Sequence, residues 1–140
     1  MLEQKKAGDW VNIDYWQYNE YYEEDRESEE EYSLVEVYSG RSYSLFTELA
    51  KVRDYNESKS TMGDPKGIPK DIHSLTKRYI DSWAGDGHSH SYHSLKELKD
   101  FDGTAIDTQV QYLIEAIEKR LNEYKSKDDE DFRIVFFFDN

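Results

Sequence analysis

The chain has 140 residues, and its 18 lysines and arginines against 31 aspartates and glutamates give a formal net charge of −13. Long-range electrostatics therefore repel phosphate backbones and attract basic surfaces, so direct nucleic-acid binding is not expected. The absence of cysteine excludes disulfides, thiolate nucleophiles and cysteine-based zinc motifs. This length suits one domain, and we expect residues 1–140 to form a single domain.

No segment has the pattern of a targeting or membrane-spanning helix. The first residues, MLEQKKAGDW, lack the apolar core of a signal peptide, and no apolar run approaches the length of about 20 residues that spans a bilayer. A soluble cytoplasmic protein is therefore expected, with no membrane partner. Aromatic residues make up 15% of the chain, and because each buries a large area we expect a folded chain.

Two strands and an acidic connection are predicted in the first quarter of the chain. Apolar and polar residues alternate from Trp10 to Tyr18, which is the period of a strand. The like charges of Glu23 to Glu31 (EEDRESEEE) cannot pack together and predict a solvated loop. Tyr32 to Tyr38 returns to β-branched and aromatic residues. We expect the two strands to pair as an antiparallel hairpin across the acidic loop.

Two helices are predicted next. Residues 39–55 place Leu45, Leu49 and Val52 at helical spacing, and Ser42 or Ser44 is positioned to cap the helix. Residues 56–69 are rich in Gly, Pro and Ser and predict a loop. The second helix is expected to begin near Pro69 and to end before Gly85.

The last third predicts a loop, two helices and a buried strand. Residues 85–93 form a histidine-rich loop, and Ser94 and Glu97 then have the spacing of a capping box at the start of a short helix. The longest helix is expected from Thr104 to Tyr124, packed across the sheet. The closing FRIVFFFDN is almost wholly apolar, which is typical of a central strand. The order of elements predicts an α+β domain with a small, mainly antiparallel sheet of about three strands and three to four helices.

Four motifs occur in a recognisable order: SGRSYSLFTELAKVRD, DPKGIPKDI, WAGDGHSHSYHSLKELKDFD and RIVFFFDN. Together they resemble a family of small proteins from phages and their bacterial hosts, with the pattern RxYxLFxxLAxVR, PxGxPxD, DGHSxSWxTxxEL and RIVFWFDN. The resemblance covers roughly residues 9 to 140. The matching positions are Arg41, Tyr43, Leu45, Phe46, Leu49, Arg53, Pro65, Gly67, Pro69, Asp86, Gly87, His88, Ser89, Ser91, Glu97, Asp139 and Asn140.

The resemblance implies a phage context and no particular chemistry. Members of the family often begin with DIH, whereas this chain has IDYW, which keeps Asp14 and lacks the histidine. His90 and His93 also lie outside the family pattern. Small acidic phage proteins are similar to one recurrent class, the anti-defence proteins, which include anti-CRISPR inhibitors of effector nucleases. The assignment to anti-defence proteins rests on this analogy between classes of protein, and on no shared motif.

The histidine-rich segment has three open interpretations. The first is a metal site for zinc or nickel, in which His88 and His90 share a face of an extended chain and are joined by His93 and Asp86. In the second, Asp86 and Gly87 form a turn and His88 makes a structural hydrogen bond. The third, catalysis, requires a metal with an open position or a nucleophile beside a base, and adjacent His88 and Ser89 do not supply that geometry.

The acidic segment is a candidate partner-binding surface, because its carboxylates imitate a line of phosphates and nearby tyrosines can serve as anchors. An ordinary solvated loop is the alternative. The residues predicted to contact the partner are Tyr21, Tyr22, Glu23, Glu24, Asp25, Glu27, Glu29, Glu30 and Glu31.

The sequence thus favours a non-enzymatic phage inhibitor, similar to anti-CRISPR proteins. It is expected to bind a basic surface of a host nuclease, such as a CRISPR effector, and to block nucleic-acid loading, with or without a structural zinc site. The second hypothesis is a small metal-dependent hydrolase or a ligand sponge that acts on a signalling nucleotide of host defence.

Overall fold

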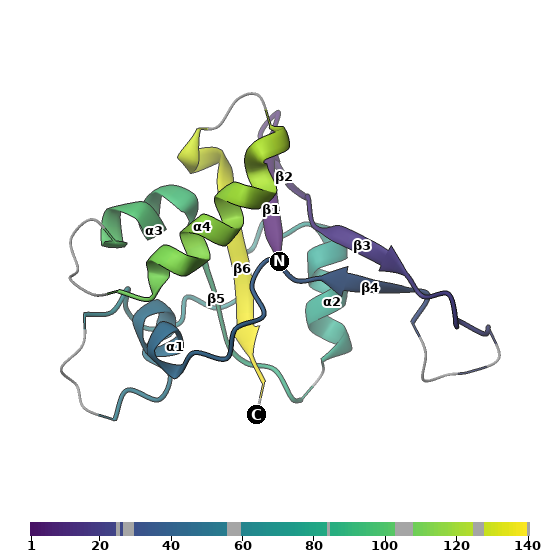
Figure 1. The fold of residues 1–140 in the computed structure, drawn as a ribbon, viewed down its shortest axis with the longest axis horizontal. Helices are drawn as coiled ribbons and strands as arrows, with labels where there is room; N and C mark the ends of the chain where they lie inside the picture. Colours follow the sequence, from purple (N-terminus) through teal and green to yellow (C-terminus); the bar gives the residue numbers. More distant parts are fainter. Residues whose placement is uncertain are drawn as a thin grey trace.

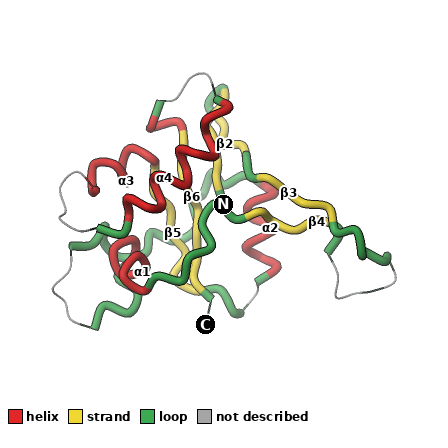
Figure 2. Tube along the Cα trace, in the orientation of Figure 1, coloured by secondary structure: helices red, strands yellow, loops and turns green. Residues whose placement is uncertain are grey.

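The main sheet has four antiparallel strands. The computed structural model describes residues 1–24, 26, 30–55, 60–83, 85–102, 108–124 and 128–139. The sheet has the order β2-β1-β6-β5, formed by β1 (Leu2–Lys6), β2 (Asp9–Asn12), β5 (His88–Ser94) and β6 (Phe132–Phe138). A second sheet pairs β3 (Tyr15–Tyr18) with β4 (Tyr32–Val35). This hairpin projects beyond the main sheet (Figures 1 and 2).

Helices lie on both faces of the main sheet, and the expected α+β class is confirmed. The described α-helices are α1 (Tyr43–Ala50), α2 (Ser74–Ser82), α3 (Leu95–Asp102) and α4 (Val110–Arg120). Helices α1, α3 and α4 lie on one face and α2 lies behind the other (Figure 1). The buried hydrophobic cluster lies on the three-helix face, and it includes Leu2, Leu45, Leu49, Leu98, Leu113, Ile117, Phe132 and Ile134. In the described part of the chain, no helix combines the length and the apolar character needed to cross a bilayer.

The predicted hairpin between the first two strands is confirmed, but its first strand is divided. Tyr15 pairs with Val35 and Tyr18 pairs with Tyr32. Between β2 and β3 the chain turns, because the Asp14 backbone N–H donates to Asn12 Oδ1 at 3.1 Å. This local hydrogen bond directs residues 9–12 into the main sheet and residues 15–18 into the second one.

Strands β1 and β5 were not predicted, because their sequences LEQKK and HSHSYHS are polar. Three buried polar side chains of these strands find partners in distant parts of the chain. Glu3 of β1 pairs with Arg133. In β5, Ser91 Oγ accepts the Lys66 backbone N–H at 3.1 Å, and His93 hydrogen-bonds the Leu49 carbonyl at 2.9 Å. The main sheet therefore has four strands, where the sequence predicted a sheet of about three.

The predicted last strand is confirmed as β6, between β1 and β5. The capping box of α3 is also confirmed, since Glu97 N donates to Ser94 Oγ at 3.0 Å and Ser94 N donates to Glu97 Oε2 at 2.7 Å. Two helix starts differ from expectation. Helix α2 begins at Ser74, later than Pro69, and α4 begins at Val110, whereas the expected start at Thr104 lies outside the described residues.

Candidate functional site

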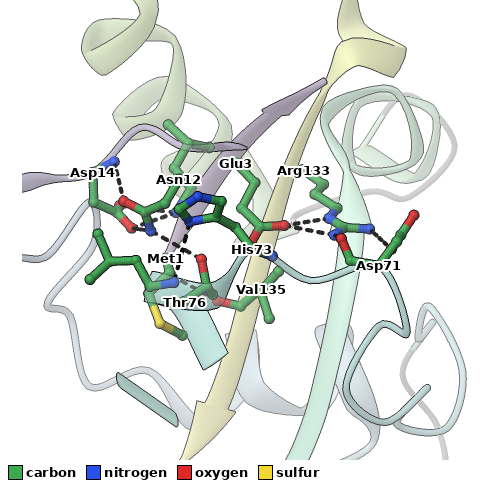
Figure 3. Close-up of polar contacts among 11 residues, drawn as sticks. Met1, Glu3, Asn12, Asp14, Asp71, His73, Thr76, Arg133 and Val135 are labelled. Atoms are coloured by element: carbon green, nitrogen blue, oxygen red, sulfur yellow. Dashed lines mark hydrogen bonds and ion pairs between the residues drawn. The ribbon is translucent and has the colours of Figure 1, made fainter. Parts of the chain in front are cut away.

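A buried ion pair connects the two central strands of the main sheet (Figure 3). Arg133 Nε donates to Glu3 Oε2 at 2.8 Å, and both side chains are almost completely buried. Arg133 also donates to Asp71 at 2.8 Å, which lowers the pKa of the Asp71 carboxyl. The ring of Trp10 covers the guanidinium at 4.1 Å. Because such a pair is costly to break and fully partnered here, we attribute it to structure.

The same network positions helix α2 behind the sheet (Figure 3). Asn12 Nδ2 donates to Asp14 Oδ2 at 2.8 Å and to Thr76 Oγ1 at 3.1 Å. Asp14 accepts the Leu2 backbone N–H, with both carboxylate oxygens within 3.0 Å. The His73 backbone N–H donates to Glu3 Oε1 at 3.0 Å. These contacts satisfy the polar groups of the network, so its evident role is to hold α2 against β1 and β2.

The histidine-rich segment forms strand β5, and a bulge separates His88 from His90. His88 pairs with Phe138 and Ser91 pairs with Phe136, while Ser89 has a φ of 52°. The rings of His88 and Phe138 lie 6.2 Å apart, and those of His90 and Phe137 lie 5.6 Å apart. Because successive residues of β6 point to opposite faces, the bulge places the two imidazoles on opposite faces of the sheet.

His93 belongs to the core rather than to an open site. Its side chain is 2% exposed, and Nε2 donates to the Leu49 carbonyl oxygen at 2.9 Å. Because a carbonyl oxygen only accepts, Nε2 carries the hydrogen and Nδ1 is left as an acceptor. No described residue donates to Nδ1, and the Glu97 carboxylate lies 4.0 Å from it. Burial lowers the pKa of His93, which keeps the ring neutral.

The four predicted metal ligands therefore lie in different surroundings. Asp86 is exposed, His88 and His90 contact different aromatic rings, and His93 lies in the core. Within the described ranges, no group of three or more His, Asp or Glu side chains is arranged to hold a metal ion. Zinc binding through Asp86, His88, His90 and His93 stays a prediction.

The described residues of the acidic segment, 23–24, 26 and 30–31, follow β3 or precede β4 at the far end of the hairpin (Figures 1 and 2). Tyr21 is 81% exposed and Tyr22 is half-buried. The exposed carboxylates of the predicted partner-binding set are Glu23, Glu24, Glu30 and Glu31. Glu23 forms an ion pair of 3.1 Å with Arg26. The other three predicted residues, Asp25, Glu27 and Glu29, lie outside the described residues.

A groove of about 470 Å³, here called the hairpin groove, lies between the hairpin and α2. Trp16 packs edge-on against Tyr79, with ring centroids 5.9 Å apart. Tyr32 is 48% exposed, so part of its ring area is accessible to a partner. The residues that line the groove are Trp16, Tyr22, Glu30, Glu31, Tyr32, Leu75, Arg78, Tyr79 and Ser82.

The hairpin groove combines aromatic rings with carboxylates, which is the chemistry that binds a cation. The negative face of an aromatic ring attracts an ammonium or guanidinium group, and a nearby carboxylate adds direct attraction. Tyr22, Glu30 and Glu31 come from the predicted partner-binding set. The contribution of α2 was missed, although Leu75, Arg78, Tyr79 and Ser82 have the spacing of one helical face. Arg78 is a cation in the same groove.

A second cavity, of about 370 Å³, lies beside the C-terminal half of β6 and is here called the β6 cavity. His88 lines it, together with Arg41, Tyr43 and Arg53. A hydrogen bond from Arg53 and the charge of Arg41 lower the pKa of the Tyr43 hydroxyl. This cluster is cationic, in contrast to the charge of the whole chain.

Comparison of the chain with protein-family models, with curated proteins and with solved structures finds no match.

Proposed function

We propose that the protein is a non-catalytic anti-defence inhibitor of phage origin that acts in the cytoplasm of the infected bacterium. It binds a basic surface of a host nuclease, a CRISPR effector being the expected partner, and blocks the loading of nucleic acid. The hairpin groove carries this proposal, because aromatic rings and carboxylates meet there on a projecting element. The phage context comes from the motif resemblance alone.

The groove explains how affinity would exceed that of a simple charged surface. A pair of unit charges at 4 Å is worth only about 1 kcal/mol in bulk water. Contact of a desolvated Lys or Arg side chain with an aromatic face adds about 2 kcal/mol. Trp16, Tyr32 and Tyr79 supply such faces, while Glu30 and Glu31 supply the charge. The exposed rings of Tyr15, Tyr18 and Tyr21 extend the surface along the hairpin.

The proposal is tested by competition for guide RNA on guide-free CRISPR effector nucleases. We expect the protein to form a complex with a nuclease and to reduce the binding of fluorescent guide RNA. Replacement of the two groove carboxylates, Glu30→Gln with Glu31→Gln, should weaken this inhibition. Replacement of Trp16 by Ala should weaken it further, because it removes an aromatic wall.

A matched control separates the groove from the net charge. The variant Asp9→Asn with Glu115→Gln removes two exposed carboxylates that do not line the groove. It should inhibit more strongly than the groove variant at the same ionic strength. The proposal would be contradicted if no nuclease forms a complex at low salt, or if both variants lose inhibition equally.

A further inference from the structure

The β6 cavity has a cationic cluster at its wall. Arg41 and Arg53 both approach the ring of Tyr43, at 6.0 Å and 4.4 Å from its centroid. No described carboxylate forms an ion pair with either guanidinium, although the chain has a net charge of −13. Two arginines that no described carboxylate pairs can present donors to a ligand at the cavity wall, and the planar guanidinium matches a phosphate with two parallel hydrogen bonds.

The backbone at Arg53 is strained in a way that positions this side chain. Its φ is 58°, and Lys51, two residues earlier, has a φ of 54°. A non-glycine residue in this left-handed region is uncommon and costs free energy, and such residues concentrate at functional sites. The strained turn after α1 brings the exposed Arg53 side chain over the ring of Tyr43.

The remaining walls of the β6 cavity are suited to an aromatic, hydroxyl-bearing ligand. Trp83 is 37% exposed, and it lines the cavity with Phe46, Phe137 and His88. Carboxylates line it as well. Asp14 already accepts the Leu2 backbone N–H, whereas Glu36 and Asp139 are exposed and suited to accept hydrogen bonds from ligand hydroxyls.

We propose that the β6 cavity binds a small phosphorylated aromatic ligand of the size of a nucleoside monophosphate. Arg41 and Arg53 contact the phosphate, an aromatic side chain such as Trp83 stacks on the ring system, and Glu36 and Asp139 accept ligand hydroxyls. A volume of about 370 Å³ lies at the small end of ligand sites, which range over about 300 to 1,000 Å³. This site is independent of the hairpin groove, although Tyr79 lines both.

Calorimetric titration of the full chain with AMP, GMP, CMP and UMP tests the proposal. Inorganic phosphate and adenosine serve as partial ligands. At least one monophosphate should bind measurably, and more tightly than either partial ligand. Arg41→Gln and Arg53→Gly should each weaken the binding about tenfold or more, because each removes a phosphate contact.

Controls separate a binding defect from a folding defect. Arg53→Gly should not lower the melting temperature, since glycine adopts positive φ without strain. Arg41 is exposed, so Arg41→Gln reports on binding even if the glycine variant unfolds. The groove variant Glu30→Gln with Glu31→Gln should bind the monophosphate normally, whatever its effect on nuclease inhibition. The proposal is overturned if none of the four monophosphates binds at about 5 mM, or if both arginine variants bind as tightly as the original chain.

Discussion

His93 is a buried imidazole whose neutral form the fold requires. Its Nε2 hydrogen is used by the Leu49 carbonyl, while Nδ1 has no donor among the described residues. Burial is the main cause of its lowered pKa, and the Leu49 carbonyl and the Glu97 carboxylate only partly oppose it. Protonation of Nδ1 would place a positive charge in the core between α1 and β5. The unfolded chain therefore binds a proton more readily than the folded one.

This imbalance predicts a pH-dependent stability with a definite sign. A histidine whose folded pKa lies below the unfolded value of about 6.5 stabilises the fold fully above that value. This stability is lost as the pH falls through about 6.5 towards the lowered pKa. Urea unfolding should therefore show a lower free energy of unfolding at pH 5.5 than at pH 7.5. In His93→Gln, which keeps a donor for Leu49, the difference should shrink.

The contribution of His90 to the pH dependence of unfolding must be removed, because partial burial lowers the pKa of His90 as it does that of His93. Both proteins therefore carry His90→Gln as a common background. The window from pH 7.5 to pH 5.5 also lies above the range in which ordinary carboxylates titrate, with pKa values of about 4. An undiminished pH difference in the His93→Gln protein would show that another group causes it.

At the scale of elements, Glu48 joins α1 to the start of α4. Its carboxylate is 5% exposed and accepts hydrogen bonds from Thr108 Oγ1 at 2.9 Å, Gln109 N at 2.8 Å and Val110 N at 3.2 Å. The first N–H groups of a helix have no partner within the helix, and the helix dipole favours negative charge there. A side chain of one helix thus caps another helix far away in the sequence.

Loss of this cap should destabilise the fold. Replacement of Glu48 by Ala leaves buried N–H groups without an acceptor, which costs about 2 to 4 kcal/mol. Glu48→Gln keeps an acceptor oxygen and loses the charge, so it should cost about 1 kcal/mol. Chemical unfolding measures both, with the exposed Glu115→Gln on α4 as the control. A change below about 0.5 kcal/mol for Glu48→Ala, the size expected at an ordinary surface site, would contradict the capping role.

Elements with local signals could be predicted from the sequence, and elements stabilised by distant partners could not. The capping box of Ser94 and Glu97 needs only four consecutive residues, and the apolar β6 is recognisable by composition alone. Strand β1 depends on Glu3 meeting Arg133, 130 positions away. Strand β5 depends on His93 meeting Leu49. No periodicity in the polar residues of β1 or β5 indicates these contacts.

The candidate sites follow the same division. The acidic residues of the hairpin were visible as a charge run, and the structure places Tyr22, Glu30 and Glu31 at the groove. The aromatic wall supplied by Tyr79 was not predicted, because an apolar stripe on a helix does not reveal that one flank lies beside a groove. The β6 cavity unites residues that are far apart in the sequence, so the histidine motif alone gave no sign of Arg41 or Arg53.

At the scale of the whole molecule, a net charge of −13 acts on any partner before contact. This field accelerates association with a basic surface, and its range is about 10 Å at 0.1 M salt. Contacts within the hairpin groove act later, because they determine how long the complex lasts. The same field opposes the approach of a nucleoside monophosphate, so binding in the β6 cavity must come from the local arginines.

The most direct test of the account is the kinetics of binding to an immobilised nuclease, measured at about 50 mM and about 300 mM salt. The groove variant Glu30→Gln with Glu31→Gln and the control Asp9→Asn with Glu115→Gln lose the same charge. Both should associate more slowly, and the loss should shrink at high salt. Only the groove variant should dissociate faster, by at least severalfold. Equal dissociation rates for the two variants would contradict the claim that the hairpin groove receives the basic side chains of the partner.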